Sequence, residues 1–213
     1  MKYYPVFWSI ADKKCVVVGG GEVAQRKVMR LLQCGAKVFV ISPDLTGELA
    51  LLKDKNKITH IAGEYSLEDI YGAALVIGAT DDEKINAAVS RDARERGIPV
   101  NIVDDPQKCD FILPSLVERG ELVIAIGTGG NSPALARRLR EELEVAYGEE
   151  YAILTGILGQ LRPRMGKKAG VGNVWFDKLL SAGLLEAIRA KNKGQVKNIV
   201  KEITGEAVEI DFA

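Results

Sequence analysis

The sequence predicts an α/β protein with a doubly wound parallel sheet, followed by a small β/α region and a helical C-terminal domain. Over the first half of the chain, short β-branched runs alternate with helical periodicities, which is the order of parallel strands joined by crossover helices. Beyond residue 110, two apolar runs are separated only by a short turn, and beyond residue 147 helical periodicity continues without strand signals. We therefore expect three parts, residues 1–110, 111–147 and 148–213.

Length and composition exclude several classes of function. The 213 residues are 47% hydrophobic and 27% charged, as in ordinary globular proteins, and the formal net charge is zero. A balanced charge gives no electrostatic basis for nucleic-acid or membrane partners, and no apolar run is long enough to span a bilayer. The N-terminus lacks a signal-peptide core and the three cysteines lack CxxC spacing, so we expect a cytoplasmic protein.

The first predicted strand ends in a glycine turn. Cys15–Val18 is a short β-branched run, and Gly19, Gly21 and Ala24 follow it with the spacing GxGxxA at the start of a predicted helix. In such a turn the first glycine allows the tight bend, the second lets a pyrophosphate approach the backbone, and the third small residue lets the helix pack on the strand. This context favours a dinucleotide site over a purely structural turn, which is the alternative.

The second strand is predicted over Lys37–Ile41. The acidic residue that binds the adenosine ribose normally follows this strand, and the first carboxylate here is Asp44, after Pro43. No arginine or lysine follows until Lys53, so a 2′-phosphate would have no cationic partner. We therefore expect NAD, and not NADP, as the cofactor.

The other elements of the sheet domain follow in order. Helices are expected over 22–35, 46–54 and 83–96, and strands over 58–61, 74–79 and 100–103. Parallel strands end at one edge of the sheet, which is where ligands bind. Thr80 and Asp104 directly follow the last two strands. We therefore expect Thr80 to contact the cofactor and Asp104 to lie beside its nicotinamide.

Asp104 is the candidate catalytic residue. The only histidine, His60, lies within a short strand, which argues against histidine-dependent triads and zinc, and we predict no metal site. An aspartate beside a nicotinamide can accept a proton as hydride leaves. A solvated turn formed by Asp104 and Asp105 before Pro106 is the alternative.

A second glycine-containing turn follows a predicted hairpin of the runs 111–117 and 122–126. Ser132 fits the N-cap of a helix over 134–147. The polar groups of Thr128, Asn131 and Ser132 are candidates for holding a substrate carboxylate. Helix capping alone is the alternative.

Two basic clusters lie outside the sheet domain, and Arg137 and Arg164 are their candidate substrate residues. The planar guanidinium group of arginine binds carboxylates bidentately, so a polyanionic substrate would explain the clusters. Solvated helix faces are the alternative. The clusters are Arg137, Arg138 and Arg140, and Arg162, Arg164, Lys167 and Lys168.

Five motifs stand in a fixed order along the chain. They are Val17–Ala24 followed by Arg26 and Lys27, Ala79–Asp82, Val100–Asp104, Phe111–Ser115 and Gly129–Ala136. Together they resemble the precorrin-2 dehydrogenases of sirohaem synthesis, from about Tyr4 to Arg140 and more loosely through the tail. This ordered set is far more specific than the glycine turn alone.

The resemblance implies an NAD-dependent oxidation of precorrin-2 to sirohydrochlorin. It further implies a homodimer with a Rossmann domain, a dimerisation region and a helical domain, and a tetrapyrrole substrate rich in carboxylates. A position that is serine in some fused members is Thr128 here, and we expect no methyltransferase domain after Ala213. The family's catalytic aspartate corresponds to Asp104, and its NAD site to Glu22, Val23, Pro43 and Asp44.

Two other interpretations stay open. An NAD-sensing regulatory module would use the glycine turn without chemistry, and it would need neither Asp104 nor the arginine clusters. Alternatively, the same enzyme would also insert ferrous iron into its product, as some members of the family do.

Overall fold

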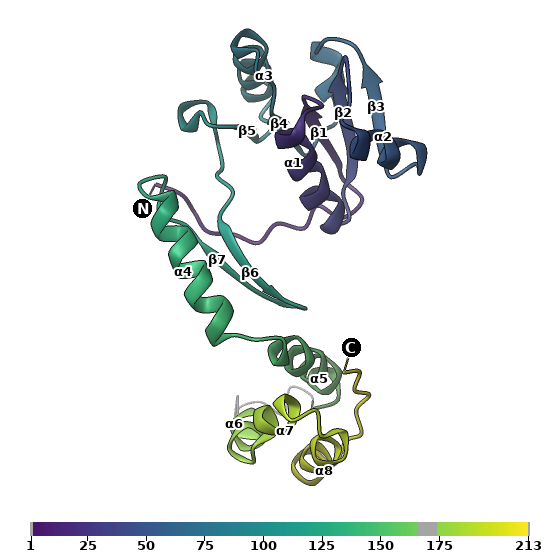
Figure 1. Cartoon of the computed structure of the whole chain (residues 1–213), viewed down its shortest axis with the longest axis vertical. Coiled ribbons are helices and arrows are strands. Elements are labelled where there is room, and N and C mark those ends of the chain that lie inside the picture. Colours follow the sequence, from purple (N-terminus) through teal and green to yellow (C-terminus); the bar gives the residue numbers. More distant parts are fainter. Residues whose placement is uncertain (1, 166–173, 213) are drawn as a thin grey trace. The chain divides into compact units, whose positions relative to one another are not determined.

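The computed structural model describes residues 2–165 and 174–212 (Figure 1). The fold divides into two compact units, one ending at Leu113 and the other beginning at Pro114. Among the described residues, no helix is long and apolar enough to cross a membrane.

The first unit contains a five-stranded sheet with the order β3-β2-β1-β4-β5, and all its strand pairs are parallel. The chain leaves β1 toward β3 and then returns to β4 on the other side of β1, so the strand order reverses between β1 and β4. Ligands bind above such a reversal. The predicted doubly wound sheet is confirmed, with the strands β1 (Lys14–Val18), β2 (Lys37–Ser42), β3 (Ile58–Ala62), β4 (Leu75–Gly78) and β5 (Val100–Ile102).

Three α-helices cover the two faces of this sheet. They are α1 (Glu22–Gln33), α2 (Gly47–Asp54) and α3 (Glu83–Glu95). Successive side chains of a strand point to opposite faces, so Cys15 and Val17 of β1 pack with α1 and α2, whereas Val16 and Val18 pack with α3. Each such buried side chain contributes about 1.5–3 kcal/mol, which explains the uniformly apolar central strand.

The second unit begins with an antiparallel hairpin. Its strands are β6 (Ser115–Arg119) and β7 (Leu122–Ile126), and Gly120 in the connecting turn has a φ of 57°. The hairpin is confirmed, but its first strand starts later than the expected residue 111. Phe111 packs instead against the core of the first unit, so the residues before Ser115 connect the two units.

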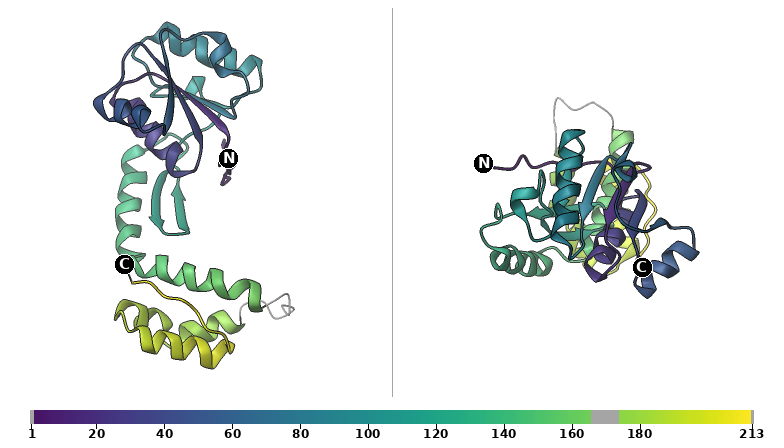
Figure 2. Two further views of the ribbon diagram at one scale, coloured as in Figure 1. Left: turned by 90° about the vertical axis from the view of Figure 1, so that its right-hand side faces the viewer. Right: turned by 90° about the horizontal axis from the view of Figure 1, so that it is seen from above.

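Helix α4 (Pro133–Ala146) begins where the sequence predicts. The Ser132 side chain accepts a hydrogen bond from the Leu135 N–H at 3.2 Å, and Pro133 occupies the first turn. In the described residues, four further helices share an apolar core that includes Val208 and Ile210 of the C-terminal segment. Figure 2 shows this segment running along the helices. They are α5 (Glu150–Met165), α6 (Val174–Ser181), α7 (Leu184–Arg189) and α8 (Lys193–Thr204).

Candidate functional site

The glycine turn joins β1 to α1 at the carboxyl edge of the sheet. Gly19 has a φ of 124°, and a Cβ there would lie 2.3 Å from the carbonyl oxygen of Ala79. A Cβ on Gly21, in contrast, would meet no atom within 4 Å. Gly19 is therefore required by the fold, while Gly21 borders open space that a closely approaching ligand can use.

Gly20 has a role that the GxGxxA spacing does not predict. A Cβ at this position would lie 1.9 Å from the Asp44 carbonyl oxygen and 2.6 Å from Ser42 Oγ. The backbone after β2 thus runs directly against the glycine turn. The run of three consecutive glycines was the available sequence signal, although only the structure shows what Gly20 approaches.

The start of α1 fits a bound pyrophosphate. No side chain caps this helix, in contrast to α2, α3 and α4, which are capped by Thr46, Asp82 and Ser132. The first N–H groups of a helix need an acceptor and favour an anion. Together with the open space at Gly21, this makes the turn suitable for the phosphates of a dinucleotide, with Glu22 and Val23 in the first turn of α1.

The segment Pro43–Asp44 leads to Thr46, which a chain of hydrogen bonds joins to the glycine turn and α1. The Thr46 N–H donates to the Gly20 carbonyl at 3.0 Å, and Thr46 Oγ1 donates to Gln25 Oε1 at 2.6 Å. The amide of Gln25 in turn donates to the carboxylate of Glu48. Asp44 is exposed close to this network, and its contact with the ribose of a cofactor stays a prediction.

Thr80 lies beside the glycine turn, as expected. Its backbone nitrogen would be 3.2 Å from a Cβ on Gly19. Its carbonyl accepts a hydrogen bond from Asn86 Nδ2 at 2.8 Å, and its hydroxyl accepts one from the Asp82 N–H at 3.2 Å. The first turns of α3 therefore hold Thr80 at the same sheet edge as Gly21.

Asp104 follows β5 in an unusual backbone conformation. Its φ is 61°, in the left-handed region, and the Asp105 N–H donates to the Ile102 carbonyl at 3.3 Å to close the turn. Most residues other than glycine avoid this region, but aspartate and asparagine adopt it more readily, and Asp12 and Asn56 share it in this chain. The turn presents Asp104 in an exposed position at the carboxyl edge of the sheet.

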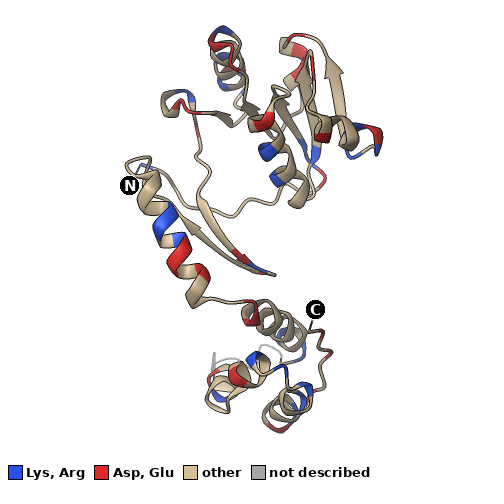
Figure 3. Cartoon of the chain, viewed as in Figure 1, with Lys and Arg blue, Asp and Glu red and all other residues tan. Residues whose placement is uncertain are grey.

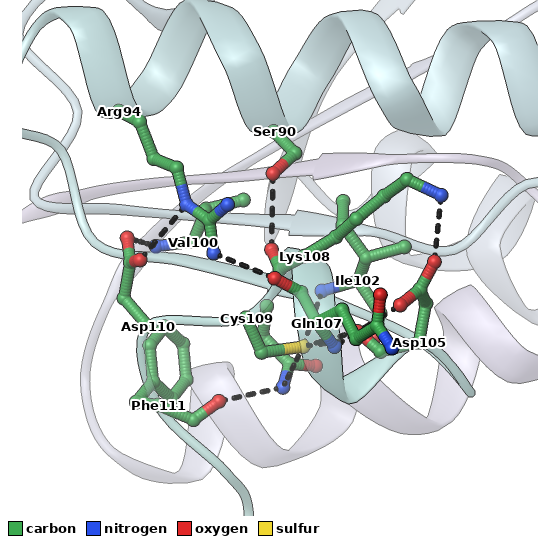
Figure 4. A network of polar contacts seen from close by, with 11 residues as sticks. Ser90, Arg94, Val100, Ile102, Asp105, Gln107, Lys108, Cys109, Asp110 and Phe111 are labelled. Carbon is green, nitrogen blue, oxygen red and sulfur yellow. Dashed lines mark hydrogen bonds and ion pairs between the residues drawn. The ribbon is translucent and has the colours of Figure 1, made fainter.

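The two adjacent aspartates differ in their partners. The carboxylate of Asp105 accepts hydrogen bonds from Lys108 Nζ at 2.6 Å and from the Gln107 N–H at 3.1 Å (Figure 4). The hydrogen bond from Lys108 is the main cause that holds the pKa of Asp105 below its usual value. Among the described residues, no hydrogen bond or ion pair engages the carboxylate of Asp104. The role of Asp104 as the base stays a prediction.

Lys27 of α1 is a further charged group near Asp104. Burial lowers the pKa of Lys27, the positive charge of Arg26 lowers it further, and the negative charge of Asp104 acts in the opposite direction. The charge of Asp104 is thus felt by a half-buried ammonium on α1. The sequence does not indicate this proximity, because Lys27 is one of several polar residues on a predicted crossover helix.

The candidate substrate residues lie in the second unit, where each has a partner within the chain. Thr128 Oγ1 donates to the Ser132 carbonyl at 3.1 Å and accepts from the Ser132 N–H at 3.2 Å, while the Asn131 N–H donates to the Thr128 carbonyl at 3.1 Å. These polar groups of the turn from Thr128 to Ser132 are therefore hydrogen-bonded to one another.

The two arginines are also engaged. Arg137 pairs with Glu141 at 2.9 Å along α4, where basic and acidic bands follow one another (Figure 3), and this pairing lowers the pKa of Glu141. Arg164 donates to the Ala207 carbonyl at 2.6 Å and lies 3.6 Å from the carboxylate of Glu206. Substrate binding by these residues stays a prediction. Lys167 and Lys168 of the second cluster lie outside the described residues.

Comparison with known families agrees with this geometry. A family described as "Putative NAD(P)-binding" matches residues 6–115, more than half of the chain. The chain belongs to this NAD(P)-binding family. A second family, described as "Sirohaem biosynthesis protein central", matches residues 119–146, which include the hairpin's second strand and α4. The NAD-type cofactor expected from the glycine turn is thereby confirmed.

Individual relatives confirm the resemblance to precorrin-2 dehydrogenases. The chain is 42% identical to a siroheme synthase of Methylobacillus flagellatus over 81% of its length, and 37% identical to one of Nitrosomonas eutropha over 98%. It spans only 37% and 45% of those two relatives. A solved structure titled "SirC, precorrin-2 dehydrogenase" has a TM-score of 0.76 and 25% identity, and the match covers 96% of this chain and 100% of that one.

Proposed function

We propose that this chain oxidises precorrin-2 to sirohydrochlorin with NAD, as a step of sirohaem biosynthesis. The observation that carries the proposal is the unpaired carboxylate of Asp104, presented by a left-handed turn at the sheet edge that also holds the glycine turn. The match to the SirC dehydrogenase extends over nearly the whole chain, which supports the same reaction here.

Each residue group would make a distinct contribution to the reaction. The uncapped start of α1 binds the pyrophosphate, and Asp44 accepts hydrogen bonds from the adenosine ribose. Bound NAD would take up the hydride that leaves precorrin-2. The Asp104 carboxylate accepts the proton that must also leave, so that one hydride and one proton are removed and the substrate gains a double bond.

Turnover distinguishes this proposal from an NAD-sensing module. Purified protein is mixed with precorrin-2 and NAD, and NADH formation is followed by absorbance. We expect continuous NADH production, with sirohydrochlorin as the product. A protein that binds NAD but forms no NADH with precorrin-2 would be a sensor.

Iron insertion is tested in the same assay. Once sirohydrochlorin has formed, ferrous ion is added, and in a parallel sample cobaltous ion. A carboxylate such as Asp104 could accept the pyrrole protons that leave when a metal enters the ring. Formation of metallated product faster than in a protein-free control would add a chelatase activity to the proposal.

The protein is further proposed to act as a cytoplasmic homodimer. Among the described residues the hairpin of β6 and β7 has no third strand, so the outer edge of each strand lacks a strand partner. A second copy of the chain that pairs with these edges or covers them would give their backbone N–H and C=O groups partners or shield them. Analytical ultracentrifugation at micromolar concentration is expected to show a dimer, and a monomer would refute this part of the proposal.

A further inference from the structure

The outer edge of β5 is covered by the chain segment that follows Asp104. In the part of the chain that the structure describes, β5 is the last strand of the sheet, and no neighbouring strand binds the backbone groups on its outer side. Buried backbone groups need partners, and open strand edges are usually protected. Here the partners come from residues 105–110, which we call the edge cover (Figure 4).

Asp110 satisfies one end of the strand. Its N–H donates to the Val100 carbonyl at 2.8 Å, and its carboxylate accepts from the Val100 N–H at 3.2 Å. The side chain of Arg94 on α3 lies 3.0 Å from the Asp110 carboxylate and also donates to the Gln107 carbonyl. The far end of the edge cover is thus attached to both β5 and α3.

Cys109 satisfies the other end, next to the turn of Asp104. Its Sγ accepts a hydrogen bond from the Ile102 N–H at 3.1 Å. The thiol lies 3.1 Å from the Ile102 carbonyl and 3.1 Å from the Asp105 carbonyl, to either of which it can donate. These two carbonyls belong to the residues on either side of Val103 and Asp104, so one side chain joins both ends of the turn.

The protonated thiol is the form that these contacts require. Burial raises the pKa of Cys109, so at neutral pH the sulfur keeps the proton that it donates. Lys108 adds a second attachment, because its ammonium binds both Asp105 and Glu83 of α3. The turn that carries Asp104 is therefore anchored both by the sulfur of Cys109 and by the ammonium of Lys108.

We infer that Cys109 and Lys108 are positioning residues for Asp104: the edge cover fixes the left-handed turn in which the base meets the substrate. This inference rests on the proposed role of Asp104 as the base. A small displacement of a catalytic group has a large effect on rate, about a hundredfold for about 1 Å. Neither residue needs to touch the substrate for its loss to slow proton transfer.

The test compares Cys109→Ala, Cys109→Ser and Lys108→Met in the full chain with precorrin-2 and NAD. We expect Cys109→Ala to lower kcat at least about tenfold while the Kd of NAD changes by less than about twofold. Cys109→Ser keeps a donor and an acceptor and should recover most of the loss. Cys34→Ala, at the exposed end of α1, is the matched control and should keep full activity.

A second set of variants separates positioning from general structural damage. In the Asp104→Asn background, Cys109→Ala should lower the residual turnover by less than about twofold, because there is no base left to position. A further tenfold loss in that background would overturn the inference, as would near-normal kcat of a folded Cys109→Ala.

If Cys109→Ala does not fold, Lys108→Met provides the test. We expect a several-fold lower kcat for this variant, and an unchanged kcat would overturn the inference. Full turnover of Asp104→Asn alone would instead refute the proposed function.

Discussion

The carboxyl edge of the sheet and the helix α4 both carry groups suited to a charged ligand, but they differ in whether those groups have partners. At the sheet edge, the start of α1 has no side-chain cap and the carboxylate of Asp104 is unpaired among the described residues. Along α4, Arg137, Arg138 and Arg140 form ion pairs with the glutamates four residues later. Charged or polar groups point to a binding site when they lack partners within the chain, and much less when they are already satisfied.

The largest effect that this comparison predicts is at Asp104. Asp104→Asn keeps the size of the side chain but cannot accept a proton at neutral pH, so we expect turnover to fall at least about a hundredfold. Asp105→Asn should lose much less, because its carboxylate already binds Lys108. The measurement is NADH formation at saturating precorrin-2, with the Kd of NAD measured separately. Near-normal turnover of Asp104→Asn would mean that Asp104 is only a turn residue.

The next largest effect separates two neighbouring glycines. Gly21→Val should leave the fold intact, because a Cβ there meets no protein atom within 4 Å, and should weaken NAD binding at least about thirtyfold, or ~2 kcal/mol. Gly20→Ala should instead lower the free energy of unfolding by about 1–3 kcal/mol or more, since its Cβ would collide with the Asp44 carbonyl. Calorimetric titration and thermal unfolding distinguish the two outcomes. Unchanged NAD affinity in Gly21→Val would make the turn merely structural.

A smaller effect is expected for cofactor choice. NAD should bind about tenfold more tightly than NADP, because Asp44 favours a ribose hydroxyl and repels a 2′-phosphate. Asp44→Asn should narrow this difference, whereas Asp54→Asn, at the other end of α2, should leave it unchanged. Dissociation constants of both cofactors provide the measurement. Tighter binding of NADP to the unmodified protein would contradict the prediction.

The smallest effect tests whether the paired arginines take part at all. Glu141→Gln releases Arg137 and loosens Arg140, which lies 3.6 Å from the same carboxylate. If Arg137 binds substrate carboxylates, its release should lower the KM for precorrin-2 by about twofold, the size of an exposed ion pair. Arg137→Ala should raise that KM by a similar factor without changing the Kd of NAD. Unchanged KM values in both variants would assign α4 a structural role.

The elements themselves were largely predictable from the sequence. Strand β1, the glycine turn and the N-cap of α4 at Ser132 all depend on residues within one local stretch. Hydrophobic periodicity and helix capping depend on residues that are only a few positions apart. They can therefore be recognised in the sequence without knowing the fold. The expected start of the first hairpin strand at Phe111 was wrong, because that side chain packs on a core formed by distant residues.

The candidate site was only partly predictable. The positions of Gly21, Thr80 and Asp104 at strand ends follow from the order of elements, because parallel strands end at a common edge. The contacts of Gly20 with Asp44, and of Gln25 with Thr46, depend on how the segment after β2 approaches α1. No spacing rule predicts such an approach.

The sequence by itself determined the α/β class, the glycine turn and the aspartate after β5, since each depends on local pattern. Only the tertiary structure showed that the carboxylate of Asp105 binds Lys108, because that contact depends on where the lysine side chain lies. It also decided that Cys109 satisfies the open edge of β5 and joins the turn of Asp104 to that strand. The partners of charged side chains and backbone groups are set by packing across the fold, which brings together residues that are far apart in the sequence.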